Sequence, residues 1–158
     1  MHPEVKIGHV HLKVSDLERS VAFYRDALGF ELMTRYGTEA AFMSAGGYHH
    51  HLGLNTWFSK GAGAAPVRAA GLFHFAILYP SRAELARALT HLLETGVEID
   101  GASDHAVSEA IYLHDPDGNG IELYRDRPME EWPRRADGEI EMVTLPLDIE
   151  DLLASARA

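Results

Sequence analysis

The residues of this sequence whose types could do chemistry are histidines and one carboxylate set among apolar residues. Glu122 stands between Ile121 and Leu123, and strand alternation would turn those two neighbours to the opposite face of a sheet. A glutamate is seldom buried without a partner. From the residues alone two interpretations stay open: a solvated glutamate on an exposed edge strand, or a metal ligand.

Two histidines would complete a metal site at Glu122. His9 and His74 each stand at the start of a predicted strand, and the two strands hold equivalent places in the two halves of the chain. Two histidines and one carboxylate on separate strands bind iron(II) and leave positions open for substrate and oxygen. Zinc or manganese would also suit these ligands. We therefore predict a metal site formed by His9, His74 and Glu122.

The first half of the chain must position His9. Residues 8–14 alternate and predict a strand, and Ser15 followed by Glu18 is a capping-box pattern that predicts a helix start. Gly29 is expected to end that helix. Further strands are predicted at residues 30–35, 40–44 and 48–54, so this half is β-α-β-β-β.

The second half repeats the plan. A strand is predicted at residues 72–79, and Ser81 with Glu84 is a second capping box for a helix that Gly96 ends. Three more strands are predicted at 97–99, 110–113 and 121–124, the last two joined by a hairpin turn rich in Asp, Pro and Gly. The helix caps, the glycines that end the helices and the turns recur in the second half at a nearly constant distance along the sequence, which indicates an internal duplication.

These elements predict an α+β fold in which two tandem β-α-β-β-β modules form curved sheets around a metal cleft. We assign residues 1–126 to one domain, with module one at about 5–58 and module two at about 70–126. Residues 127–158 are predicted to be a C-terminal extension that packs on the body or on a partner subunit. A strand at 139–147 and a helical turn at 149–153 are expected within it.

Composition narrows the function classes. The chain has 158 residues, 46% of them hydrophobic and 24% charged, which are ordinary values for one globular domain. It has no cysteine, which excludes disulfides, cysteine-bound metal and a thiol nucleophile. A net charge of −10 opposes binding to nucleic acid or to an anionic membrane. No stretch is typical of a signal peptide or a membrane span, so we expect a cytoplasmic protein.

Two segments carry a family resemblance. GHVHLKVSDLERSVAFYRDALGF, from Gly8, and AIYLHDPDGNGIELYRD, from Ala110, resemble the vicinal oxygen chelate superfamily. That superfamily contains glyoxalase I, extradiol ring-cleaving dioxygenases, fosfomycin-resistance thiol transferases and bleomycin-binding proteins. The resemblance covers roughly residues 5–126 and is more specific for the fold than for the reaction.

Within the superfamily the chain is most similar to type I extradiol catechol dioxygenases. The resemblance implies that His9, His74 and Glu122 hold iron(II). The two histidines would lie on the first strand of each module, and the glutamate on the last strand of module two. It also implies three catalytic residues. Tyr112 would contact the bound catecholate, His105 would line the pocket, and His50 would be the acid/base histidine. The implied partners are a small aromatic substrate, O2 and a second subunit in a homodimer. Many relatives carry four modules, whereas this chain has two.

Rival interpretations remain open at this point. Aligning the halves through Gly47 and Gly118 places His51, not His50, opposite Glu122. With His51 as a fourth ligand for nickel or zinc, the resemblance would imply a glyoxalase I-like isomerase. The superfamily also contains non-catalytic drug-binding proteins of the bleomycin-resistance type, which lack the metal ligands. A metal-bound but catalytically idle subunit is the remaining alternative.

Overall fold

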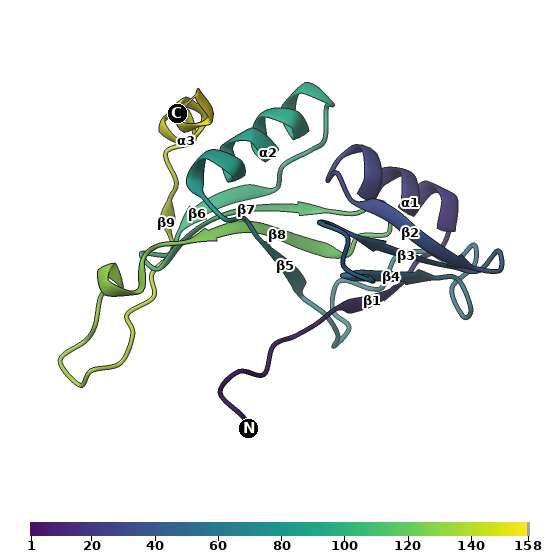
Figure 1. Ribbon diagram of the computed structural model, residues 1–158, viewed down its shortest axis with the longest axis horizontal. Coiled ribbons are helices and arrows are strands. Elements are labelled where there is room, and N and C mark those ends of the chain that lie inside the picture. The colour runs from purple at the N-terminus through teal and green to yellow at the C-terminus, as the bar shows by residue number, and fades with distance from the viewer. Residues whose placement is uncertain (158) are drawn as a thin grey trace. The chain divides into compact units, whose positions relative to one another are not determined.

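The computed structural model describes residues 1–157, which form two compact units. Unit 1 consists of residues 1–70 and 115–118, and unit 2 of residues 71–114 with residues from 119 onward. Each unit contains one mixed sheet, of four strands in unit 1 and five in unit 2 (Figure 1). The element order β-α-β-β-β occurs twice, which confirms the predicted α+β fold of two tandem modules.

Unit 1 is a four-stranded sheet with one helix on one face. Its elements in chain order are β1 (Val10–Lys13), α1 (Leu17–Asp26), β2 (Glu31–Tyr36), β3 (Ala40–Ser44) and β4 (Leu52–Asn55). The strands lie in the order β1-β4-β3-β2, with β1 parallel to β4 and the other pairs antiparallel. Apolar residues of α1 and the strands form a buried core that includes Leu12, Val14, Val21, Tyr24, Met43, Leu52 and Leu54.

The start of α1 differs from the prediction by one residue. The cap is Asp16, whose side chain accepts a hydrogen bond from the Arg19 backbone N–H at 3.1 Å. Ser15 donates instead to Asp117, through its hydroxyl at 2.5 Å and its N–H at 3.1 Å. The capping-box interpretation of Ser15 was therefore wrong, because a carboxylate distant in sequence takes both donors of this residue.

Unit 2 repeats the arrangement and adds a fifth strand. Its elements are β5 (His74–Leu78), α2 (Arg82–Glu94), β6 (Gly101–Asp104), β7 (Ser108–His114), β8 (Gly120–Asp126), the 3₁₀ helix η1 (Met129–Glu131), β9 (Leu145–Pro146), α3 (Ile149–Ala154) and η2 (Ser155–Arg157). The strand order is β5-β8-β7-β6-β9, with β5 parallel to β8. Helix α2 lies over one face of this sheet (Figure 1). The predicted cap at Ser81 is confirmed, since its side chain accepts from the Glu84 N–H at 3.2 Å.

Three predicted strands differ most from the structure, whereas most of the others shift by only one or two residues at an end. Residues 97–99 are not a strand, because the N–H of Val97 bonds back to the Leu92 carbonyl at 2.9 Å and closes the end of α2. Strand β4 begins only at Leu52, since Gly46 and Gly47 both adopt positive φ and start a turn. Within residues 139–147, only the two residues of β9 belong to the sheet.

The C-terminal residues pack on unit 2. Strand β9 pairs antiparallel with β6, and α3 packs against α2 with Leu152 fully buried. In Figure 1 the yellow α3 lies beside the teal α2. Within residues 1–157, no helix is both long and apolar enough to cross a membrane.

Candidate functional site

The hairpin of β7 and β8 positions Glu122. Its neighbours Ile121 and Leu123 are fully buried, whereas Glu122 projects from the other face with a side chain 13% exposed. Strand β8 lies between β5 and β7, so it is not an edge strand. The interpretation of Glu122 as a solvated glutamate on a sheet edge was therefore wrong.

His74 is the nearest partner of Glu122. Its Nε2 lies 2.9 Å from Oε2 of Glu122, although the two residues stand on different strands. The parallel strands approach closely here because the residue opposite His74 is Gly120. A Cβ on Gly120 would lie 2.2 Å from the Phe73 carbonyl oxygen and 3.1 Å from the Cβ of His74. This contact between β5 and β8 requires a glycine.

Tyr112 and His105 extend this group along the same face of the sheet. Tyr112 is the register partner of Glu122, and its hydroxyl lies 3.3 Å from Oε1 of that glutamate. The same hydroxyl lies 2.6 Å from Nε2 of His105. Burial, followed by the charge and the hydrogen bond of Glu122, raises the pKa of Tyr112 to about 12. Unit 2 thus joins His74, Glu122, Tyr112 and His105 in one chain of contacts.

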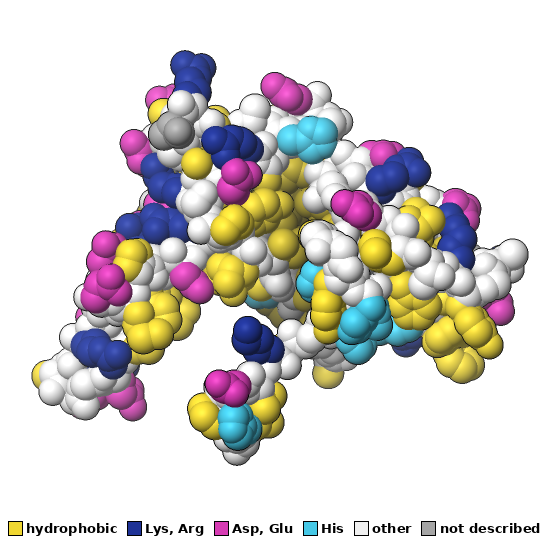
Figure 2. Space-filling model, in the orientation of Figure 1, with side chains coloured by type: hydrophobic (Ala, Val, Ile, Leu, Met, Phe, Trp, Pro, Cys, Tyr) yellow, Lys and Arg dark blue, Asp and Glu magenta, His cyan; other side chains and the backbone are white. Residues whose placement is uncertain are grey.

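His9 and His50 lie together in unit 1. His9 directly precedes β1 and is exposed, and its ring centroid lies 4.4 Å from that of His50. Nδ1 of His50 is 2.7 Å from Nδ1 of His49, and its ring also packs on Phe42. Burial, and then the neighbouring charge of His9, lowers the pKa of His50. Figure 2 shows histidine side chains gathered beside the start of β1.

His51 has a different environment from His50. Its Nδ1 lies 3.0 Å from the Ser44 hydroxyl and 3.3 Å from the Ala45 N–H. Its ring packs against Tyr48 rather than His9. Of the two adjacent histidines, His50 is therefore the one that contacts His9.

The residues present suit a metal ion in part. Within residues 1–157 no group of three or more histidine, aspartate or glutamate side chains is arranged to hold one. His74 and Glu122 nevertheless place an imidazole nitrogen and a carboxylate oxygen side by side, which are the donor types that iron(II) and zinc accept. These two residues fit as ligands, and His9 as the third ligand stays a prediction.

Two features of the site region were missed from sequence. The Val143 carbonyl lies 2.7 Å from Nδ1 of His105, a contact that spans 38 residues and that no local pattern indicates. His11, an exposed residue, lies over Gly53, where a Cβ would stand 2.8 Å from the imidazole ring. A glycine opposite a histidine in the parallel pair β1 and β4 was the only signal for the second feature.

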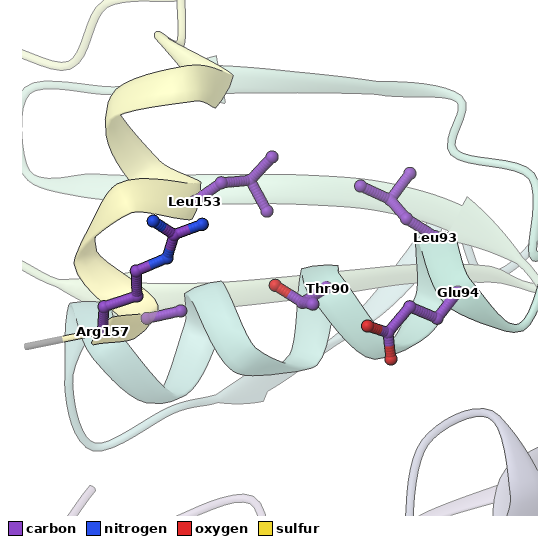
Figure 3. Close-up of a pocket in the computed structure, with 6 residues that line it drawn as sticks. Thr90, Leu93, Glu94, Leu153 and Arg157 are labelled. Carbon is purple, nitrogen blue, oxygen red and sulfur yellow. The ribbon is translucent and has the colours of Figure 1, made fainter.

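A pocket elsewhere in unit 2 contains none of the predicted site residues. It has a volume of about 370 Å³ and lies between α2 and the C-terminal helices, lined by Thr90, Leu93, Glu94, Leu153, Ala156 and Arg157. Figure 3 shows Leu153 and Arg157 reaching it from the C-terminal helices and Thr90 from α2. We assign no chemistry to this pocket.

Comparison with known proteins decides the family. The model of the Glyoxalase/Bleomycin resistance protein/Dioxygenase superfamily matches residues 6–123. The chain belongs to this superfamily. It is 45% identical over 99% of its length to the catechol-2,3-dioxygenase of Bacillus subtilis (strain 168), of which it covers 54%. It is also 30% identical to the biphenyl-2,3-diol 1,2-dioxygenase 3 of Rhodococcus globerulus, in an alignment that covers 77% of this chain and 63% of that relative.

The chain therefore spans a little more than half the length of these two superfamily members. Solved structures of the superfamily share its fold. The lactoylglutathione lyase of Agrobacterium tumefaciens aligns with a TM-score of 0.60 at 24% identity, over 78% of this chain and 95% of that one. At this identity the likeness establishes the fold and not the reaction.

Proposed function

We propose that the protein is a metal-dependent extradiol dioxygenase that cleaves the ring of a catechol-type aromatic with O2. The observation that carries this proposal is the chain of contacts from His74 through Glu122 and Tyr112 to His105. Its residue types match the ligand and substrate-binding roles implied by the resemblance, and the chain is 45% identical to a protein named as a catechol-2,3-dioxygenase. A homodimeric assembly belongs to the same proposal.

His74 and Glu122 are proposed to hold the metal together with His9. Iron(II) is the ion we propose, with manganese, zinc or nickel as the alternatives that these ligands accept. When bound, the metal would supply Lewis-acid and redox chemistry toward the catechol and O2. Glu122 brings a charge that its partial burial leaves little hydrated, which favours pairing with a cation.

Tyr112 and His105 are proposed to bind the substrate oxygens. The Tyr112 hydroxyl can donate a hydrogen bond to one oxygen, and Nε2 of His105 lies close enough to share the same proton. Because β7 fixes Tyr112 in register with Glu122, a hydroxyl bound there would also be held next to the metal ligands. These groups would orient the ring and exclude water from one side of it.

His50 is proposed to move protons during the reaction. Its ring contacts the ring of His9, one of the proposed ligands, so an acid/base group would lie next to the metal. An imidazole titrates in the range where it can both take and return a proton. Of the two adjacent histidines, His50 is assigned this role because its ring contacts that of His9, whereas Nδ1 of His51 faces Ser44.

The first test is anaerobic titration of iron(II) into the wild type and Glu122→Ala. We expect one tight site in the wild type and binding weaker by at least about a hundredfold in the variant, since loss of one of three ligands should exceed the roughly 10–100-fold cost of losing an outer-shell partner. Glu98→Ala, which removes an exposed carboxylate elsewhere in unit 2, is the matched control and should bind like the wild type. The loaded wild type is then assayed with catechols and O2. A Glu122→Ala protein that binds iron and cleaves catechols as the wild type does would falsify the proposal.

A further inference from the structure

The turn between β6 and β7 holds His105 in a constrained backbone. The backbone N–H of His105 donates to the Ser108 carbonyl at 2.9 Å. The next residue, Ala106, has φ of 65°, and within residues 1–157 it is the only non-glycine residue with positive φ. Its N–H is held by the Asp104 side chain at 2.8 Å. Non-glycine residues in this conformation are strained and persist where surrounding contacts enforce them.

A segment of the C-terminal extension, residues 143–146, contacts this turn. The Val143 carbonyl lies 2.7 Å from Nδ1 of His105, and the Val143 N–H donates to the His105 carbonyl at 3.3 Å. The following residues, Leu145 and Pro146, form β9 and pair with β6. Main chain and side chain of His105 are therefore both held by the same segment.

The contact with Val143 determines which ring nitrogen of His105 carries a proton. A carbonyl oxygen can only accept a hydrogen bond, so Nδ1 must be the protonated nitrogen when this bond forms. In a neutral imidazole the other nitrogen, Nε2, is then an acceptor. Its partner at 2.6 Å is the Tyr112 hydroxyl, which must be the donor in that bond.

The direction of this bond matters at Glu122. A phenol has one proton, which Nε2 of His105 at 2.6 Å and Oε1 of Glu122 at 3.3 Å can both accept. The shorter contact makes His105 the stronger acceptor, and Glu122 receives only a long, weak bond. The carboxylate oxygen that faces Tyr112 is thus left without a strong donor. It stays available to a cation, while Nε2 of His105 stays available to accept a hydroxyl proton.

We propose that residues 143–146 complete the site by fixing His105 in the tautomer protonated at Nδ1, with the Val143 carbonyl as the positioning group. His105 then presents an acceptor nitrogen to Tyr112 or to a substrate hydroxyl in its place. The catalytic part of this inference rests on the proposed function, whereas the tautomer itself does not. The C-terminal extension would accordingly take part in the site as well as in packing on α2.

The tautomer is tested by ¹⁵N NMR of ring-labelled histidines in the full chain loaded with zinc(II), which is diamagnetic. His105→Asn assigns the signals of His105. We expect Nδ1 protonated and Nε2 unprotonated in the wild type. In a second variant, residues 140–145 are replaced by an equal number of Gly and Ser residues, which keeps α3. Both tautomers of His105 should then be populated. Met142→Ser is the matched control, because it replaces one exposed side chain of the same stretch and leaves residues 143–146 unchanged.

Activity provides a second measurement. With iron(II) and catechol as the probe, the Gly/Ser variant should lose at least about tenfold in kcat/KM, because a flexible segment no longer fixes the carbonyl that orients the imidazole. Met142→Ser should retain the wild-type value and the wild-type pH profile. Nε2 found protonated in the wild type, or an unchanged His105 spectrum in the Gly/Ser variant, would overturn the inference. Absence of turnover in the wild type would refute the proposed function and leave the NMR test decisive.

Discussion

Substituting Gly120 tests whether the spacing of two strands places His74. A Cβ at this position would lie 2.2 Å from the Phe73 carbonyl oxygen, so the start of β5 would have to retreat by roughly 1 Å to reach an ordinary contact distance. Backbone atoms cannot yield as a side chain can. We therefore expect Gly120→Ala to lower the free energy of unfolding by about 1–3 kcal/mol, the usual cost of overpacking.

The same displacement would move His74 away from Glu122. A misplacement of about 1 Å at a functional group can cost roughly a hundredfold in activity, and we expect a loss of at least about tenfold in iron(II) affinity. Chemical denaturation measures the first effect, and anaerobic iron(II) titration measures the second.

Gly101→Ala is the matched control for this experiment. Gly101 also lies in a strand of unit 2, and a Cβ there would meet nothing within 4 Å. It should leave metal affinity unchanged. If Gly120→Ala lost stability but bound iron(II) as tightly as the wild type, the spacing of β5 and β8 would not be what places His74.

Two further predictions concern the scaffold of unit 2. Burial opposes ionisation of Glu109, but hydrogen bonds from Arg125 and Arg82 outweigh it and lower the pKa. The stability from this depressed pKa is present above the unfolded value of about 4.3 and is lost as pH falls through the folded pKa. Glu109→Gln should therefore unfold more easily at neutral pH, by about 1–3 kcal/mol, with a shallower loss in acid, measured by denaturation at several pH values. If the free energy of unfolding fell equally steeply in acid for both proteins, this reasoning would be contradicted. Ala106→Gly should raise the free energy of unfolding by about 0.5–1 kcal/mol, since relief of positive-φ strain exceeds the added entropy of the unfolded chain. Thermal denaturation measures it, and a loss of stability would show that Ala106 is not strained.

Much of the fold could be predicted because its signals are local. Ser81 caps α2, glycines at 29 and 96 end the two helices, and the turn between β7 and β8 contains the expected Asp, Pro and Gly. Each of these residues acts through its own φ or through a bond to a residue two to four positions away. The error at Ser15 arose because a distant partner, Asp117, competes for its donors. The strand errors at residues 97–99 and before β4 arose from turns whose extent the sequence did not fix.

The residue types of the candidate site were equally visible in the sequence. Alternation of apolar residues around Glu122 was sufficient to turn its side chain away from the core, because strand geometry sends adjacent side chains to opposite faces. The duplicated pattern drew attention to His9 and His74 as an equivalent pair. The choice of His50 over His51 as the residue beside His9 needed the structure, since the turn before β4 sets which ring lies there.

Sequence by itself determined which chemistry the chain could do, because the kinds of donor atom and their alternation along strands are properties of the residues. Tertiary structure alone decided which atoms meet. The approach of His74 to Glu122 depends on strand pairing across Gly120, and the proton of His105 depends on a carbonyl 38 residues away. A main-chain carbonyl is present at every residue, so no side-chain pattern could have singled out the one at Val143.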